Sequence, residues 1–184
     1  MASTIVHEVT EDREVDRTST NPATVAMWLG YAVAAYGFFL AGGKHHAAAA
    51  LEPVAIWSVG GLGIISFVRH AVLHRSDAAR MGWDLGLRNN FQLEVGMANL
   101  AWGLAAIAAV SFDWGVAAQA GITLLFAAYL LQAFVLHLVS MRDGSQGRHG
   151  SAAWVPTIAT LALTLTLAYY AIDALKAAGI KPLN

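Results

Sequence analysis

Long apolar segments dominate the chain, and short polar segments separate them. A helix that crosses a bilayer needs about 20 largely apolar residues. Five segments meet this requirement, at residues 24–43, 53–73, 91–110, 115–139 and 152–173. The pattern therefore predicts an all-α fold, an integral membrane helical bundle with five transmembrane helices. Four transmembrane helices with a re-entrant segment are the alternative.

The composition supports a membrane protein and narrows the chemistry. Hydrophobic residues make up 57% of the chain and charged residues only 12%, whereas soluble domains carry about 25% charged residues. A net charge of −1 gives no overall basic field, so we expect no nucleic acid partner. There are no cysteines, so a metal would need His, Asp, Glu, Asn, Gln or Met as ligands.

The first 22 residues differ from the rest because they are polar and acidic. They lack the basic start and the apolar core of a signal peptide. We expect residues 1–22 to form a disordered cytosolic tail and residues 23–184 to form a single transmembrane helical domain.

The basic residues between the segments predict the orientation. Cytoplasmic loops of membrane proteins are enriched in Lys and Arg. With five helices, one side receives eight arginines and the other receives three lysines. We therefore expect a multi-pass protein of the plasma (inner) membrane of a prokaryote, with the N-terminus in and the C-terminus out. The arginines are Arg13, Arg17, Arg69, Arg75, Arg80, Arg88, Arg142 and Arg148, and the lysines are Lys44, Lys176 and Lys181.

Connections and small residues predict how the helices pack. The short segment 111–115 predicts a tight hairpin, and loop 74–90 is long enough for a short helix that Ser76 would cap. Glycines allow two helix backbones to approach closely. We expect such packing at Gly60, Gly61 and Gly63 in the second helix and at Gly96 and Gly103 in the third. In the fifth helix, Thr157, Thr160 and Thr164 form a stripe on one face. We expect this face to pack against a neighbouring helix while each hydroxyl bonds to a preceding backbone carbonyl.

Four of the ionisable residues inside or at the ends of the apolar segments are candidates for a site, because ionisable groups are costly there. They are His70, His74, Glu94 and His137. The predicted topology brings them to the same cytoplasmic depth from three different helices. This convergence is the strongest functional signal in the sequence.

The spacing of these residues favours a metal or haem site. His70 and His74 are four residues apart, so both face one side of a helix and can share an ion. With Glu94 and His137 they would form a three-His, one-Glu site for Zn, Fe, Mn or Cu. Haem ligation by His70 and His137 is the other form of this hypothesis. Ser66, Gln92 and Asn99 would support the ligands or pack.

Each of these residues also has a structural interpretation. His70 follows Arg69 and His74 precedes Arg75, so both histidines would then lie among the lipid headgroups. Glu94 would then be a helix-start carboxylate, since Asn89 and Gln92 fit the spacing of a capping box. His137 would be a core histidine bonded to a carbonyl.

Polar groups lie on two faces of the third helix. Gln92 and Asn99 share one face with Gly96 and Gly103, whereas Glu94 lies nearly opposite. Polar groups on both faces predict a helix surrounded by protein at the centre of the bundle.

The stretch MGWDLGLRNNFQLEVGMANLAWG (81–103) resembles the signature of a group of small prokaryotic integral membrane proteins of unknown function. In that group a Gly-Trp pair precedes a Phe-Gln-x-Glu-Val-Gly-x-Ala-Asn-Leu-x-x-Gly run. The resemblance covers roughly residues 67–150, and Asn89-Asn90 replaces the usual Ser-Pro. It implies a polytopic bundle around this motif and implies no activity. The matching residues are Gly82, Trp83, Phe91, Gln92, Glu94, Val95, Gly96, Ala98, Asn99, Leu100 and Gly103.

Three functions are consistent with these patterns. The first is a metal- or haem-binding bundle, with catalysis left open. The second is a small proton-coupled transporter that uses Glu94 and His137. The third is an accessory structural subunit of a larger membrane complex. The expected partners are the lipid bilayer and either further copies of this chain or that complex.

Overall fold

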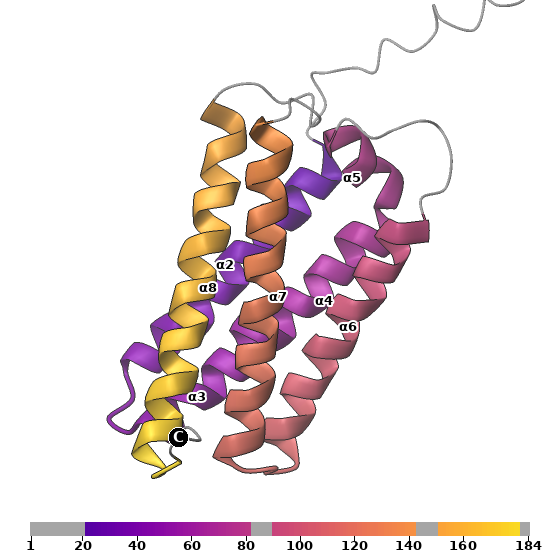
Figure 1. The fold of residues 1–184 in the computed structure, drawn as a ribbon. Coiled ribbons are helices and arrows are strands. Elements are labelled where there is room, and N and C mark those ends of the chain that lie inside the picture. Colours follow the sequence, from indigo (N-terminus) through magenta and orange to yellow (C-terminus); the bar gives the residue numbers. More distant parts are fainter. Residues whose placement is uncertain (1–20, 82–89, 143–150, 181–184) are drawn as a thin grey trace, which may run out of the picture.

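The computed structural model describes residues 21–81, 90–142 and 151–180, which form helices and no strand (Figure 1). Five helices are long and apolar enough to cross a membrane, which confirms the predicted bundle. The predicted tail lies, up to residue 20, outside the described residues. The five helices are α2 (Pro22–Gly42), a continuous second helix (Ala47–Val72), α6 (Asn90–Ser111), α7 (Val116–Arg142) and α8 (Ser151–Ala177).

The first helix begins at a cap that also anchors a short helix, α5 (His74–Met81). The Asn21 side chain accepts hydrogen bonds from the backbone N–H groups of Ala23 (2.9 Å) and Thr24 (3.3 Å), and this is a favoured N-cap arrangement. The Ser76 hydroxyl donates to the same Asn21 oxygen at 2.8 Å. The prediction that Ser76 caps a helix in loop 74–90 is therefore wrong, because α5 begins two residues earlier and Ser76 instead joins α5 to α2.

The second helix begins at Ala47, six residues before the predicted start, so Pro53 lies inside it rather than in its first turn. Proline has no N–H to donate, and its ring crowds the preceding turn. A π-helical segment follows immediately, and a second one ends the helix. In order, the segments are α3 (Ala47–Pro53), η1 (Val54–Gly61), α4 (Leu62–Phe67) and η2 (Val68–Val72).

The two ends of the bundle differ. At one end, residues 111–115 join α6 to α7 in the predicted tight hairpin, in which Asp113 (φ 48°) and Gly115 (φ 83°) adopt left-handed conformations. We call this the hairpin end. At the other end α7 finishes and α2, α6 and α8 begin, and α5 lies beside them (Figure 1). We call this the α5 end.

Glycines bring the second helix and α6 into backbone contact, which confirms the predicted seam. A Cβ atom added at Gly63 would lie 2.6 Å from the Asn99 carbonyl oxygen and 2.9 Å from the Gly103 Cα. One added at Gly96 would lie 2.8 Å from the Ala71 Cβ. A side chain at these positions would push the helices apart.

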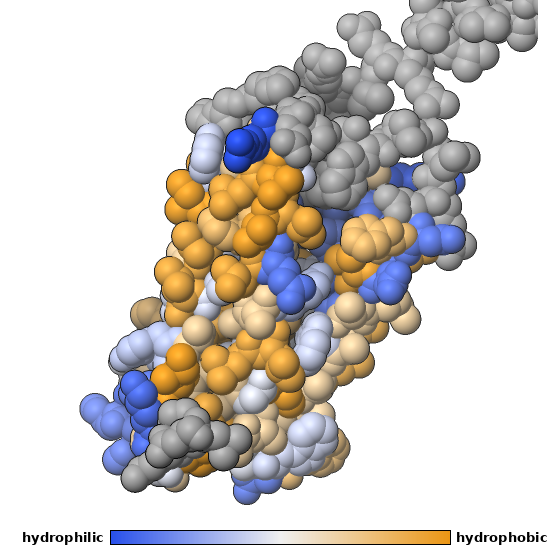
Figure 2. All heavy atoms as spheres, in the orientation of Figure 1, coloured by the Kyte–Doolittle hydropathy of each residue, from blue (hydrophilic) through white to orange (hydrophobic). Residues whose placement is uncertain are grey.

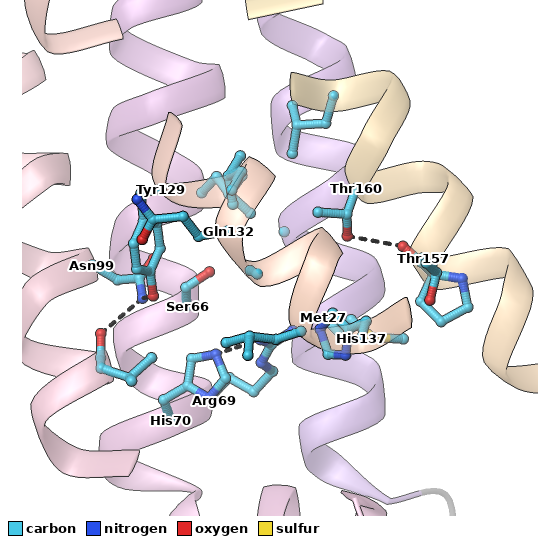
Figure 3. A pocket seen from close by; sticks show the side chains of 18 of the residues that line it. Met27, Ser66, Arg69, His70, Asn99, Tyr129, Gln132, His137, Thr157 and Thr160 are labelled. Carbon is cyan, nitrogen blue, oxygen red and sulfur yellow. Dashed lines mark hydrogen bonds between the residues drawn. The ribbon is translucent and has the colours of Figure 1, made fainter. Parts of the chain in front are cut away.

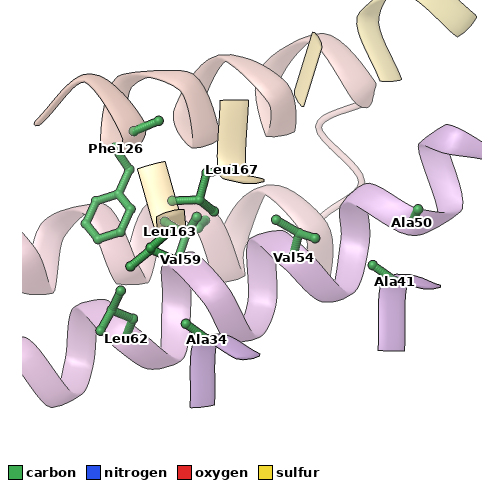
Figure 4. Packing of buried hydrophobic residues seen from close by; sticks show 11 residues of the cluster. Ala34, Ala41, Ala50, Val54, Val59, Leu62, Phe126, Leu163 and Leu167 are labelled. Carbon is green, nitrogen blue, oxygen red and sulfur yellow. The ribbon is translucent and has the colours of Figure 1, made fainter. Parts of the chain in front are cut away.

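The apolar core fills the middle of the bundle and its hairpin end (Figure 4). Val54 and Val59 of the second helix are fully buried and belong to one cluster with Phe126 of α7 and Leu167 of α8. Asp77, Gln92 and Thr157 are buried polar residues toward the α5 end, whereas Gln119 is buried near the hairpin end. The core therefore fixes the five helices at one end and leaves the other end for a site.

The second helix, rather than α6, is the centre of the bundle. In its most apolar stretch 56% of the residues are buried, compared with 28% in α6. The prediction that α6 is surrounded by protein is therefore wrong. The face of α6 that carries Glu94 and Met97 is exposed, because α6 packs through its glycine face alone.

The outer surface of the bundle is largely apolar, as expected for helices in contact with lipid. Figure 2 shows hydrophobic residues along most of the length of α7 and α8, with hydrophilic residues toward the two ends. Large apolar side chains such as Phe39, Leu136 and Leu165 are more than 60% exposed. Lipid tails would cover this apolar surface without a cost in free energy.

Candidate functional site

A pocket of about 570 Å³ lies between the five long helices at the α5 end (Figure 3). Ligand pockets in proteins commonly enclose 300–1,000 Å³. Every one of the five helices contributes polar side chains, although polar groups inside a membrane span are costly. The polar lining residues are Tyr31, Ser66, Arg69, His70, Gln92, Asn99, Tyr129, Gln132, His137, Ser140, Thr157 and Thr160.

A fully buried carboxylate, Asp77 of α5, organises one wall of this pocket. His70 Nδ1 lies 2.8 Å from Asp77 Oδ2, and Arg69 Nε lies 3.7 Å from Asp77 Oδ1. The Gln92 amide of α6 donates to Asp77 Oδ2 at 3.2 Å. One carboxylate thus ties together α5, η2 and α6.

Arg69 and His70 both line the pocket although they are adjacent in the sequence. Successive residues of an α-helix point about 100° apart. Both residues belong to the π-helical segment η2, whose wider turn reduces that angle. The Arg69 guanidinium also donates to His70 Nε2, which leaves the other ring nitrogen of His70 to donate to Asp77.

Two hydrogen-bonded contacts limit the pocket on the side of the core. The Asn99 amide of α6 donates to the Tyr129 hydroxyl of α7 at 3.0 Å and to its own helix at the Val95 carbonyl. Between α2 and α8, the Tyr31 hydroxyl lies 2.8 Å from the Thr160 hydroxyl and donates to the Pro156 carbonyl at 3.1 Å. These contacts hold the helices together at the base of the pocket.

The structure brings some of the predicted site residues together. His70 and His137 line the pocket, with Ser66, Gln92 and Asn99. Figure 3 displays His70 and His137 on different helices around the same space. The predicted supporting residues therefore belong to this pocket.

The other two predicted ligands lie elsewhere. His74 Nδ1 is 3.0 Å from the Ala71 carbonyl oxygen, and His74 is not part of the lining. Glu94 is exposed on the outer face of α6. Across the part of the chain that the structure describes, no group of three or more His, Cys, Asp or Glu side chains is placed to hold a metal ion.

Several residues of the pocket and its wall were not predicted as site residues, among them Arg69, Tyr129, Gln132 and Asp77. Arg69 was interpreted as a marker of orientation, and Tyr129 and Gln132 as part of an apolar segment. Asp77 lies in the loop between two predicted helices. The turn at Leu73 (φ −94°, ψ 23°) directs α5 back toward η2, and hydrophobic periodicity carries no information about that turn.

Comparison with known proteins identifies a family. A model described as "Family of unknown function (DUF6790)" matches residues 20–176. No curated protein and no solved structure matches the chain. The match agrees with the predicted membership of a family without known function. The signature in residues 81–103 and the prokaryotic source stay predictions.

Proposed function

The chain belongs to this family of unknown function, and we propose, from the pocket, that it is a membrane protein that binds a small anionic ligand at the α5 end of its bundle. The observation that carries this proposal is the charge of the lining. Arg69, His70 and His137 line the pocket, and within the described ranges the lining contains no Asp or Glu. A ligand there meets basic groups without facing a carboxylate.

The chemistry of Arg69 supports an anion rather than a cation. A guanidinium stays charged at all physiological pH values, and its planar donors match carboxylate and phosphate oxygens. Asp77 contacts Arg69 and His70 from outside the pocket, since its side chain is fully buried and is not part of the lining. The carboxylate therefore positions the basic groups without occupying the ligand's place.

Binding of defined anions to the purified full chain tests this proposal. The probes are decanoate, inorganic phosphate and acetate, and the neutral control is decanamide. A ligand that binds only the folded state stabilises it by about 2.7 kcal/mol at 100 times its dissociation constant. We expect at least one anion to raise the thermal midpoint in neutral detergent and decanamide to leave it unchanged.

Matched His→Gln variants locate the site. We expect His137→Gln to weaken the binding of the anion about tenfold or more, because a charge-assisted hydrogen bond contributes about 1.5–3 kcal/mol. His45→Gln, at an exposed position near the hairpin end, should bind like the wild type. Equal stabilisation by decanamide, or equal binding by both variants, would contradict the proposal.

A second candidate function is the predicted metal or haem site, now centred on His70 and His137. The observation that favours it is the 2.8 Å contact between Asp77 and His70, because metal-ligating histidines commonly bond to a carboxylate through their other nitrogen. The Arg69 guanidinium at His70 Nε2 opposes it, since a cation would be repelled there. Metal analysis and an absorption spectrum of the purified protein test this candidate, and colourless, metal-free protein that ignores added Zn²⁺ and Fe²⁺ would exclude it.

A further inference from the structure

We propose that the ligand is an anionic amphiphile of the surrounding leaflet, which enters the pocket sideways between α6 and α7. Its charged head would lie at Arg69 and His137, and its chain would lie along the apolar part of the lining. This inference rests on the proposed anion-binding function and adds the class of ligand and its route.

The first step of the argument is the divergence of α6 and α7. The two helices are joined at the hairpin end and are bonded again at Asn99 and Tyr129. Beyond that bond they separate toward the α5 end (Figure 1). In the same orientation, Figure 2 shows hydrophilic side chains in a hollow of the surface between them.

The second step is the exposure of the residues along this opening. Phe91 of α6 and Leu136 of α7 line the pocket, yet they are 60% and 62% exposed. A side chain that both lines a pocket and is exposed marks the place where the pocket opens. Both side chains are apolar, so the opening faces the hydrocarbon of a bilayer rather than water.

The third step is a polar group in that opening. Gln132 lies on α7 one turn from Leu136, lines the pocket and is exposed. Its amide forms no hydrogen bond with the described part of the chain. A polar group without a partner in hydrocarbon costs several kcal/mol. An ester or hydroxyl group next to the head of an amphiphile would provide that partner.

Contacts among α2, α7 and α8 close the opposite side of the pocket. Tyr31 of α2 bonds to α8 at Thr160 and Pro156, and the Thr157 hydroxyl of α8 contacts the Met141 sulfur of α7 at 4.0 Å. Entry from the membrane is therefore directed to the opening between α6 and α7.

The lining matches both halves of an amphiphile. Basic groups lie on η2 and on the last turns of α7, at Arg69, His70 and His137. Apolar side chains extend from the opening toward the core and would cover a hydrocarbon chain; they are Leu62, Val95, Leu130, Ala133 and Leu163. A small soluble anion would leave this apolar surface uncovered.

Retention of lipid by the full chain tests the inference. The protein is reconstituted in vesicles of phosphatidylcholine and phosphatidylglycerol and extracted with a mild neutral detergent. Native mass spectrometry then identifies the lipid that stays bound. We expect the wild type to retain phosphatidylglycerol in preference to phosphatidylcholine. Leu136→Trp fills the opening and should reduce that retention about tenfold or more.

Two further variants keep the test independent of folding. Val135→Trp adds the same side chain at the adjacent residue, which is exposed and lies outside the lining. This variant should retain lipid like the wild type. Gln132→Leu changes an exposed side chain and should weaken retention about fivefold, because a hydrogen bond contributes about 1 kcal/mol.

The outcomes separate this inference from the proposed function. If phosphate or acetate stabilises the protein while no phosphatidylglycerol is retained and Leu136→Trp changes nothing, the ligand arrives from water and the amphiphile is excluded. If no anion stabilises the protein and no anionic lipid is retained, both proposals fail. Equal retention of the two lipids would also overturn the inference.

Discussion

Asp77 determines the arrangement of the polar wall, because one buried carboxylate contacts an arginine, a histidine and an amide. Replacing a buried charge that has several partners leaves those partners buried without compensation. The same contacts connect three successive helical segments, η2, α5 and α6. The stability of the α5 end and the orientation of Arg69 thus depend on the same residue.

We expect Asp77→Asn to lower the free energy of unfolding by roughly 2–3 kcal/mol, somewhat below the usual cost of breaking a fully buried pair because Arg69 keeps some exposure. Thermal unfolding in neutral detergent measures the change. Asp113→Asn is the matched control, since Asp113 is exposed in the hairpin and asparagine tolerates its positive φ. Equal midpoints for the two variants would show that the Asp77 contacts contribute little.

Glu94 distinguishes the anion-binding pocket from the predicted three-His, one-Glu site. Its side chain is exposed on α6 and is not part of the lining. We therefore expect Glu94→Gln to leave decanoate binding unchanged within the error of a thermal titration. A large loss of binding would instead place Glu94 at the site and favour the metal or transport hypotheses.

At the scale of the helices, close packing of the second helix against α6 supports the pocket wall. Gly63→Ala places a Cβ against the backbone at Asn99 and Gly103, which cannot move without shifting α6. Overpacking costs about 1–3 kcal/mol, and the gain in helix propensity offsets up to about 1 kcal/mol of this. We expect a net loss of stability in thermal unfolding.

Gly121→Ala is the control for this prediction. Gly121 lies inside α7, and a Cβ added there meets no atom within 4 Å. This variant should keep or slightly raise the thermal midpoint. Stability losses of equal size in both variants would mean that the seam between the second helix and α6 is not tightly packed.

The same scale explains what the sequence predicted and what it did not. Uniformly apolar segments identify membrane helices directly, so the five helices and the hairpin at 111–115 were predicted correctly. The start at Ala47 was missed because Pro53 resembles a first-turn residue. Exposure of the Glu94 face was missed because burial in a bundle depends on which helices are neighbours, and sequence periodicity does not specify neighbours.

The residues that line the pocket could be predicted in part, for a similar reason. His70 and His137 were identified because ionisable residues stand out in apolar segments. Asp77, the partner of His70, was missed because it belongs to a polar connection, where a carboxylate is common. Long-range contacts such as that between Asp77 and Gln92 depend on the turn between η2 and α5.

At the scale of the molecule, charge separates the two ends. The described arginines belong to segments at the α5 end, and Lys44 and Lys176 lie at the hairpin end. The positive-inside rule then predicts a cytoplasmic α5 end, with the pocket in the inner leaflet. Association of several copies and assembly into a larger complex stay predictions, as does transport.

The absence of cysteine makes the orientation directly measurable, because a single introduced cysteine is the sole target of a maleimide. Asn90 and Ser111 are exposed at opposite ends of α6. In bacterial spheroplasts, a membrane-impermeant maleimide should label Ser111→Cys at once and Asn90→Cys only after permeabilisation. The reverse pattern would place the α5 end outside, and a ligand from the leaflet would then come from the outer one.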